Sequence, residues 1–159
     1  MVEETDMNIN KDMNESKRVG SLVETEKQQC YLNAMRVVSR VPGYESADYV
    51  EGYAVIGSNF CIEHGWVETD CVIIDPTLPD DDIAYFPGLR FTGGLGIAEA
   101  LQLPNKDWCE DLPIFYRFGW GGIESTEFRS AIVAAYRYAG LEDMAKRYEE
   151  WEPVCATRA

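Results

Sequence analysis

Three runs rich in Val, Ile and aromatic residues follow one another in the middle of the chain, and they constrain the fold more than any other feature. They cover residues 49–57, 59–68 and 71–75, with only short polar interruptions between them. Runs of this length and composition, bounded by turn residues, are typical of β-strands. Because the connections are short, the sequence predicts an antiparallel meander.

Helical patterns lie on both sides of these runs. Apolar residues at helical spacing from Cys30 to Val41 predict a helix with a broad buried face, which Pro42 and Gly43 end. Its start lies either at Thr25, which forms a capping box with Gln28, or nearer Gln29. Further along, the patterns predict a long acidic loop at 76–87, a short strand at 90–92, a short helix ending near residue 101, strand character at 114–118, and two closing helices at 125–138 and 141–151.

The length and composition suit one domain. The chain has 159 residues, of which 46% are hydrophobic, enough for a single packed core. Residues 1–20 show no sustained period and predict a flexible acidic leader or a frayed helix, followed by one α+β domain at 21–159. The N-terminus is acidic where a secretory signal is basic and then apolar, and an odd number of cysteines, five, fits reduced thiols. These features predict a cytoplasmic protein that does not span a membrane.

The charge is strongly negative and unevenly distributed. The chain carries 28 acids against 14 bases, for a net charge of −14. Residues 41–89 contain no Lys or Arg, although the same stretch holds many of the acids. This charge opposes direct nucleic-acid binding, which needs clustered Lys and Arg. It predicts a protein or peptide partner that presents Lys or Arg near the reacting bond, and it leaves the oligomeric state open.

The only histidine, His64, belongs to the second run, and Asp75 ends the third. If a tight loop centred on Thr69 and Asp70 joins the two strands, His64 lies directly opposite Asp75, with Cβ atoms about 4.5 to 5.5 Å apart. A carboxylate on one imidazole nitrogen fixes the tautomer and stabilises the imidazolium. Cys30, near the start of a buried helix where the dipole favours the thiolate, is the candidate nucleophile.

These residues resemble the papain-like superfamily, and particularly its transglutaminase-like branch. The order is similar, with a cysteine on a helix (Cys30-Tyr31-Leu32-Asn33-Ala34), then a histidine on a strand (His64-Gly65-Trp66-Val67-Glu68), then an aspartate on the next strand. The resemblance also extends to short uncharacterised bacterial and phage proteins. It implies an N-terminal Cys-bearing helix packed on an antiparallel sheet, and a triad in which Cys30 attacks, His64 transfers the proton and Asp75 orients His64.

Four further residues are candidates for lining this site. Gln28 or Gln29, together with the Cys30 backbone N–H, is positioned in the sequence to donate to an oxyanion. In the papain-like pattern the corresponding glutamine lies several residues before the cysteine, whereas here the candidates lie one and two residues before it. Trp66 shares a strand face with His64 and is expected to pack beside it. Glu51 interrupts an apolar strand, either as an acid of the site or as an exposed residue at a sheet edge.

Each triad residue also has a structural interpretation. Cys30 is also compatible with a buried core thiol. His64 is compatible with a core histidine whose hydrogen-bonding need Asp75 meets, and Asp75 with a turn residue before Pro76. A zinc site from Cys61, His64 and Cys71 is disfavoured, because residues three apart on a strand point to opposite faces and no fourth ligand completes the set. We therefore expect neither a metal nor a cofactor.

Two functions remain open from the sequence. The first is a thiol enzyme that transfers or hydrolyses an acyl group on an amide, isopeptide or thioester bond, as a cysteine protease or a transglutaminase-like acyltransferase does. The alternative is an acidic, non-catalytic binding protein on the same fold, such as a phage-encoded inhibitor of a host protein or a nucleic-acid mimic. A transglutaminase-like fold that has lost its activity and acts as a scaffold is the third interpretation.

Overall fold

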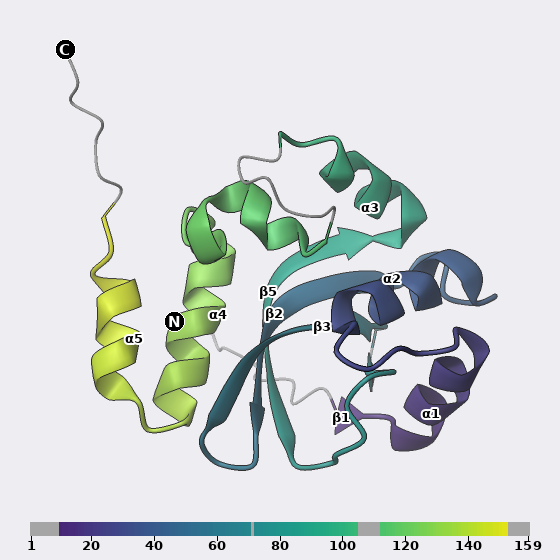
Figure 1. Cartoon of the computed structure of the whole chain (residues 1–159), viewed down its shortest axis with the longest axis horizontal. Helices are drawn as coiled ribbons and strands as arrows, with labels where there is room; N and C mark the ends of the chain where they lie inside the picture. The colour runs from purple at the N-terminus through teal and green to yellow at the C-terminus, as the bar shows by residue number, and fades with distance from the viewer. Residues whose placement is uncertain (1–9, 71, 105–111, 153–159) are drawn as a thin grey trace.

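Over the residues that the structure describes, the protein is an α+β fold with a five-stranded mixed sheet and five α-helices (Figure 1). The structure is a computed structural model that describes residues 10–70, 72–104 and 112–152. The strands run in the order β1-β4-β3-β2-β5 across the sheet. The elements are β1 (Asn10–Lys11), α1 (Met13–Leu22), α2 (Cys30–Arg40), β2 (Asp48–Ile56), β3 (Phe60–Glu68), β4 (Val72–Ile74), β5 (Ile83–Thr92), α3 (Gly93–Leu101), the 3-10 helices η1 (Ile114–Phe118) and η2 (Trp120–Gly122), α4 (Thr126–Tyr138) and α5 (Glu142–Glu149).

The predicted meander forms the centre of the sheet. β2 pairs with β3 along its full length, and β3 pairs with β4, in both cases antiparallel. The prediction of a purely antiparallel sheet is wrong at one edge, because β1 pairs with β4 in parallel. β1 contributes only two residues, Asn10 and Lys11, which is too short a run for a sequence pattern to reveal.

β5 corrects the prediction of a long loop at 76–87 and a strand confined to 90–92. The strand begins at Ile83 and pairs with β2 along its ten residues, which places it at the opposite edge from β1. A register shift between Glu51 and Gly52 accommodates the Pro87 and Gly88 region. Proline cannot donate to a ladder hydrogen bond, so an edge strand with an irregularity is where it is tolerated.

Helix α1 corrects the prediction of a flexible leader, for the part of it that the structure describes. Asp12 caps the helix by accepting a hydrogen bond from the Glu15 N–H at 2.9 Å. Val19 is fully buried and packs in the main core cluster with residues of α2 and the sheet. Residues 1–9, the rest of that leader, lie outside the described residues.

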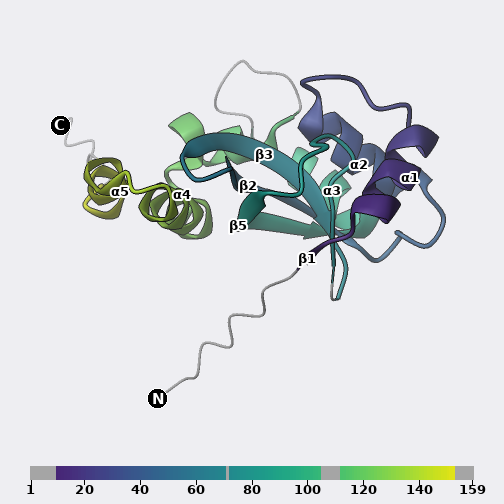
Figure 2. The same ribbon diagram turned by 90° about the horizontal axis from the view of Figure 1, so that it is seen from below.

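Helix α2 packs one face against the sheet. It starts at Cys30, so the start near Gln29 is the observed one and Thr25 lies before the helix. Its buried residues Ala34, Val37 and Val38 join Tyr49 and Val67 in the core. Figure 2 shows α1, α2 and α3 gathered over one end of the sheet, and α4 and α5 beside the other end. The face of the sheet opposite α2 carries a smaller apolar cluster of Val50, Trp66 and Ile73.

The two closing helices are confirmed. The Ser125 side chain caps α4 by accepting from the Phe128 N–H, and Gly140, with a φ of 72°, lies between α4 and α5. Residues 114–118, predicted to have strand character, instead form η1. None of the helices in the described ranges is both long and apolar enough to cross a membrane.

Candidate active site

His64 and Asp75 are in contact within the protein interior. The His64 Nε2 and Asp75 Oδ2 atoms lie 2.9 Å apart, and each residue is only 1% exposed. The predicted register is wrong, because Val67 faces Ile74 and Glu68 faces Ile73, an offset of two residues from the expected pairing. A shift of two keeps every side chain on its face. Asp75 therefore still reaches His64, as a diagonal neighbour rather than a direct one.

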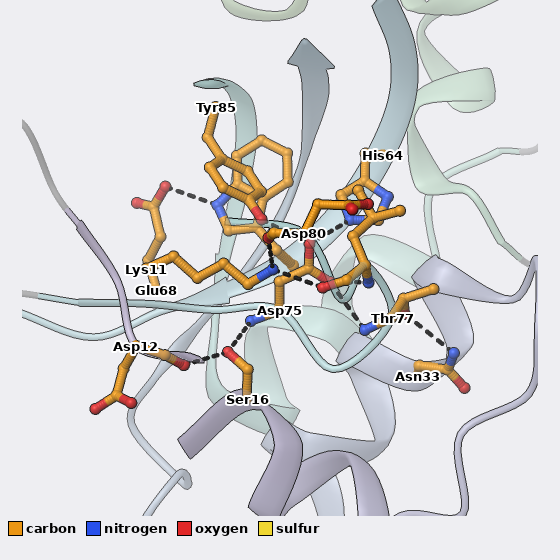
Figure 3. A network of polar contacts seen from close by, with 12 residues as sticks. Lys11, Asp12, Ser16, Asn33, His64, Glu68, Asp75, Thr77, Asp80 and Tyr85 are labelled. Carbon is orange, nitrogen blue, oxygen red and sulfur yellow. Dashed lines mark hydrogen bonds and ion pairs between the residues drawn. The ribbon is translucent and has the colours of Figure 1, made fainter. Parts of the chain in front are cut away.

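Both oxygens of the Asp75 carboxylate accept hydrogen bonds (Figure 3). Besides the His64 ring, Oδ2 accepts from the Tyr85 hydroxyl at 2.7 Å. Oδ1 accepts from the backbone N–H groups of Thr77 at 2.9 Å and Leu78 at 3.1 Å. Asp75 is therefore both a turn former and the hydrogen-bond partner of His64.

Cys30 approaches His64 at an open stretch of the β3 edge. β4 pairs only with Val67 and Glu68, so the edge of β3 near His64 has no strand beside it among the described residues. The start of α2 packs over a face of β3 at this stretch, since a Cβ placed on Gly65 would lie 2.7 Å from the Tyr31 ring. The Cys30 residue, immediately before Tyr31, is partly exposed. Its thiol is near enough to His64 to contribute, through hydrogen bonding and charge, to the raised pKa of the imidazole.

The electrostatics of the site favour a charged His64. Burial lowers the pKa of the imidazole, but the charge and hydrogen bond of Asp75, followed by the hydrogen bond and charge of Cys30, outweigh it and raise this pKa to about 9. Burial raises the pKa of the Asp75 carboxyl, but the charge and hydrogen bond of His64 outweigh it, so that this pKa is lowered overall. Because Asp75 occupies Nε2, the ring nitrogen left for the thiol is Nδ1.

Asn33 fixes the segment that leads into Cys30. This fully buried side chain donates from Nδ2 to the Glu26 carbonyl at 2.8 Å and accepts the Glu26 N–H at 3.1 Å. Its Nδ2 also lies 3.1 Å from the Thr77 hydroxyl, two residues after Asp75. Asn33 thus joins the approach to Cys30, helix α2 and the turn at Asp75 into one polar network.

The side chains of the two glutamines at the helix start face solvent, which does not favour their predicted role as oxyanion donors. Gln28 and Gln29 are exposed, and Gln29, the residue before the helix, makes no capping hydrogen bond with its side chain. The first helical hydrogen bond runs from the Asn33 N–H to the Gln29 carbonyl. The N–H groups of the first turn, including that of Cys30, therefore lack acceptors within the helix, and they are the donors best placed for an oxyanion.

Trp66 and Glu51 lie on opposite faces of the sheet. The Trp66 ring stacks on the His64 ring at 6.1 Å between centroids and is fully buried, as expected for a neighbour on the same face. Glu51 is neither an edge residue nor a contact of His64, because β2 is a central strand and Glu51 pairs with Gly65. Its carboxylate instead accepts the N–H groups of Ile114 and Phe115, both at 2.7 Å, and anchors η1.

Three residues that hold Asp75 and the loop after it by hydrogen bonds lie in segments for which the sequence patterns predict no functional residue. Tyr85 belongs to β5, in a stretch whose pattern predicts a loop, and Ser16 belongs to α1, within the predicted leader. The Asp75 N–H donates to the Ser16 hydroxyl at 3.0 Å, while Lys11 Nζ donates to the carbonyls of Leu78 at 2.5 Å and Asp80 at 2.9 Å. The apolar and aromatic residues at 83–86 are the signal for the first half of β5, whose end at 90–92 the sequence patterns do predict.

The described residues contain no cluster of three or more His, Cys, Asp or Glu side chains arranged to hold a metal ion. Cys61 lies on the face of β3 opposite His64 and donates weakly to the Ala135 carbonyl at 3.7 Å, whereas Cys71 lies outside the described residues. A cavity of about 740 Å³ opens on the His64 face, lined by Lys11, Tyr85 and Arg90 among others. Neither Cys30 nor His64 lines it, so this cavity is not at the thiol.

Searches against protein-family models, curated proteins and solved structures gave no match to this chain. The arrangement of Cys30, His64 and Asp75 is therefore interpreted from its own chemistry.

Proposed function

We propose that the protein is a thiol enzyme that transfers or hydrolyses an acyl group on an amide, isopeptide or thioester bond. The observation that carries the proposal is the buried His64–Asp75 pair at 2.9 Å, together with a Cys30 thiol at the start of α2 that acts on the imidazole through its charge and hydrogen bonding. The thiol is partly exposed while its two partners are buried. This is the distribution that a nucleophile with a protected acid–base partner needs.

In this mechanism the Cys30 Sγ attacks the carbonyl carbon of the acyl donor, and the electron pair of the carbonyl moves to its oxygen. The Cys30 N–H at the start of α2 donates to that oxygen. When the tetrahedral species collapses, the carbon–leaving-group bond breaks and His64 gives its proton to the leaving group. Water or an amine then attacks the thioester carbon and His64 takes a proton from it. The carbon–sulfur bond breaks, and Cys30 leaves as a thiolate beside the protonated His64.

Acylation itself prepares His64 for the second half of the reaction. The charge and hydrogen bond of Cys30 are two of the contributions that raise the His64 pKa. Both disappear when the sulfur carries an acyl group, while the burial that lowers the pKa remains. The imidazole is consequently a weaker base in the acyl-enzyme than in the free enzyme, and it is neutral more readily when it must accept a proton.

We extend the proposal to a papain-like or transglutaminase-like relationship, supported by the chain order of the helix-borne cysteine, strand histidine and following aspartate. A reducing cytoplasmic setting fits the free thiols of Cys30 and Cys61.

The test is acylation by an activated ester such as p-nitrophenyl acetate, followed by peptide mass spectrometry. The expected result is an acetyl group on Cys30 and release of p-nitrophenol in a burst, both lost in Cys30→Ser and His64→Ala. Cys61→Ser is the matched control, because Cys61 is the other described free thiol and burial raises its pKa. Equal acetylation of Cys30 in the wild type and in His64→Ala would overturn the proposal.

A further inference from the structure

Glu63 lies next to the start of α2, on the face of β3 against which α2 packs. Because strand side chains alternate, Glu63 and Gly65 share the face opposite His64. Tyr31 packs directly on Gly65, since a Cβ placed on this glycine would lie 2.7 Å from the Tyr31 ring. Burial, followed by the charges of Cys30, Glu51 and Glu63, raises the pKa of the Tyr31 hydroxyl. Tyr31, the neighbour of Cys30 in the chain, therefore packs on the same face of β3 as Glu63 and lies within reach of the Glu63 charge.

One tyrosine contacts this carboxylate and two more lie near it. The Tyr53 hydroxyl donates to Glu63 Oε1 over a long 3.4 Å, and the Tyr53 and Tyr136 ring centroids are 5.9 Å apart. The Glu63 charge contributes to the raised pKa values of Tyr31, Tyr53 and Tyr136, after burial as the main cause. Tyrosines from three different elements thus lie within reach of the charge of one carboxylate.

Glu63 has no cationic partner within the described part of the chain. None of the ion pairs among these residues includes it, and no Lys or Arg occurs between residues 41 and 89. The residue as a whole is exposed, yet its carboxylate is partly shielded from water. This burial raises the Glu63 pKa and outweighs the Tyr53 hydrogen bond, which lowers it. A partly dehydrated carboxylate without a counter-charge gains most from a ligand that brings one.

We propose that Glu63, with the rings of Tyr31, Tyr53 and Tyr136, binds a Lys or Arg side chain of the acyl donor beside Cys30. This inference rests on the proposed function, since it assigns specificity to the same thiol. A carboxylate neutralises the cation, and tyrosine rings within about 6 Å add cation–π attraction. The substrate class is therefore a protein or peptide with a basic residue next to the reacting carbonyl.

The experiment compares two alkylating probes, a lysyl chloromethyl ketone and its norleucyl counterpart, which has nearly the same shape without the charge. In each reaction the Cys30 sulfur bonds to the methylene carbon, the carbon–chlorine bond breaks and chloride leaves. Mass spectrometry gives the rate at Cys30 with each probe. The wild type is expected to prefer the lysyl probe by between about threefold and tenfold, and Glu63→Gln to abolish this preference.

Asp70→Asn is the matched control, because it removes the same charge from an exposed residue just after β3. Asp70 lies roughly 20 Å along the chain from Glu63 at about 3.3 Å per residue, beyond the reach of screened charge in physiological salt. This variant should keep the preference. The ratio of the two rates is measured within one variant, so partial unfolding of Glu63→Gln does not change its meaning.

The outcomes separate the two proposals. If Cys30 reacts no faster than Cys61 with either probe, the proposed function fails. If Cys30 reacts fast but Glu63→Gln keeps the lysyl preference, only the binding of the cation at Glu63 is refuted. Loss of the preference in Asp70→Asn as well would also refute it, since the cause would then be the general negative field of the protein.

Discussion

Replacement of Asp75 by asparagine tests the electrostatics of the site. The change keeps the size of the side chain and leaves a carbonyl oxygen able to accept the N–H groups of Thr77 and Leu78. It removes the charge that opposes the burial of the His64 imidazolium. With burial the dominant remaining influence, the His64 pKa should fall from about 9 to below its ordinary value of 6.5.

The magnitude follows from that shift. A rise from 6.5 to about 9 corresponds to about 3 kcal/mol of preference for the imidazolium in the folded state. Because the His64 pKa is higher in the folded state, its protonation stabilises the protein. This contribution is complete below the unfolded-state pKa of 6.5 and is lost as the pH rises through about 9. The Asp75 pKa is lowered, so its contribution is present above 3.8 and is lost as the pH falls through the folded value. Asp75→Asn should therefore be most destabilising between these limits, at about pH 4 to 6.5.

The chain contains a single histidine, so an NMR titration of the imidazole carbon-bound protons reports His64 without ambiguity. Denaturant unfolding at acid-neutral and alkaline pH gives the matching stability difference. Asp70→Asn, the same chemical change at an exposed turn, should leave both quantities unchanged. A wild-type His64 that titrates near 6.5, or a variant in which it still titrates near 9, would refute the reasoning.

Three further substitutions probe the support of the site. Gly65→Ala should slow alkylation of Cys30, because its Cβ would approach the Tyr31 ring to 2.7 Å and the Tyr31 Cα to 3.1 Å; Gly94→Ala, with nothing within 4 Å, is the control. Asn33→Ala should lower the free energy of unfolding by about 1 to 3 kcal/mol in denaturant titrations, because it leaves the buried hydrogen bonds to Glu26 unmade. Burial raises the Glu51 pKa from 4.5 to about 7, so wild-type stability should decline as the pH rises through that interval; Glu51→Gln should remove this decline, and an unchanged pH profile would contradict the assignment.

The central strands and α2 are predictable from the sequence because their signals are local. Alternation and β-branched residues mark β2 and β3, and the spacing from Cys30 to Val41 marks α2. The predicted His64–Asp75 contact tolerates a register error because an even shift preserves the face of each side chain. The correct pair thus follows from an incorrect alignment of the two strands.

The parts that the sequence does not reveal depend on contacts between distant residues. β1 has two residues, and α1 is held by Val19 in the core and by Ser16 at Asp75, which no local period reveals. The role of Glu51 depends on η1, which lies 63 residues later in the chain. Local composition assigns residue 85 to an acidic loop, because the three aspartates before it dominate that stretch of sequence.

The most direct test of the central claim is the rate of iodoacetamide labelling of Cys30 at neutral pH, with Cys61 in the same molecules as the internal reference. If His64 activates Cys30 as the nucleophile, Cys30 should label faster than Cys61, whose pKa is raised by burial. His64→Ala should slow the labelling of Cys30 and leave the labelling of Cys61 unchanged. Equal labelling rates of Cys30 in the wild type and in His64→Ala would contradict the account.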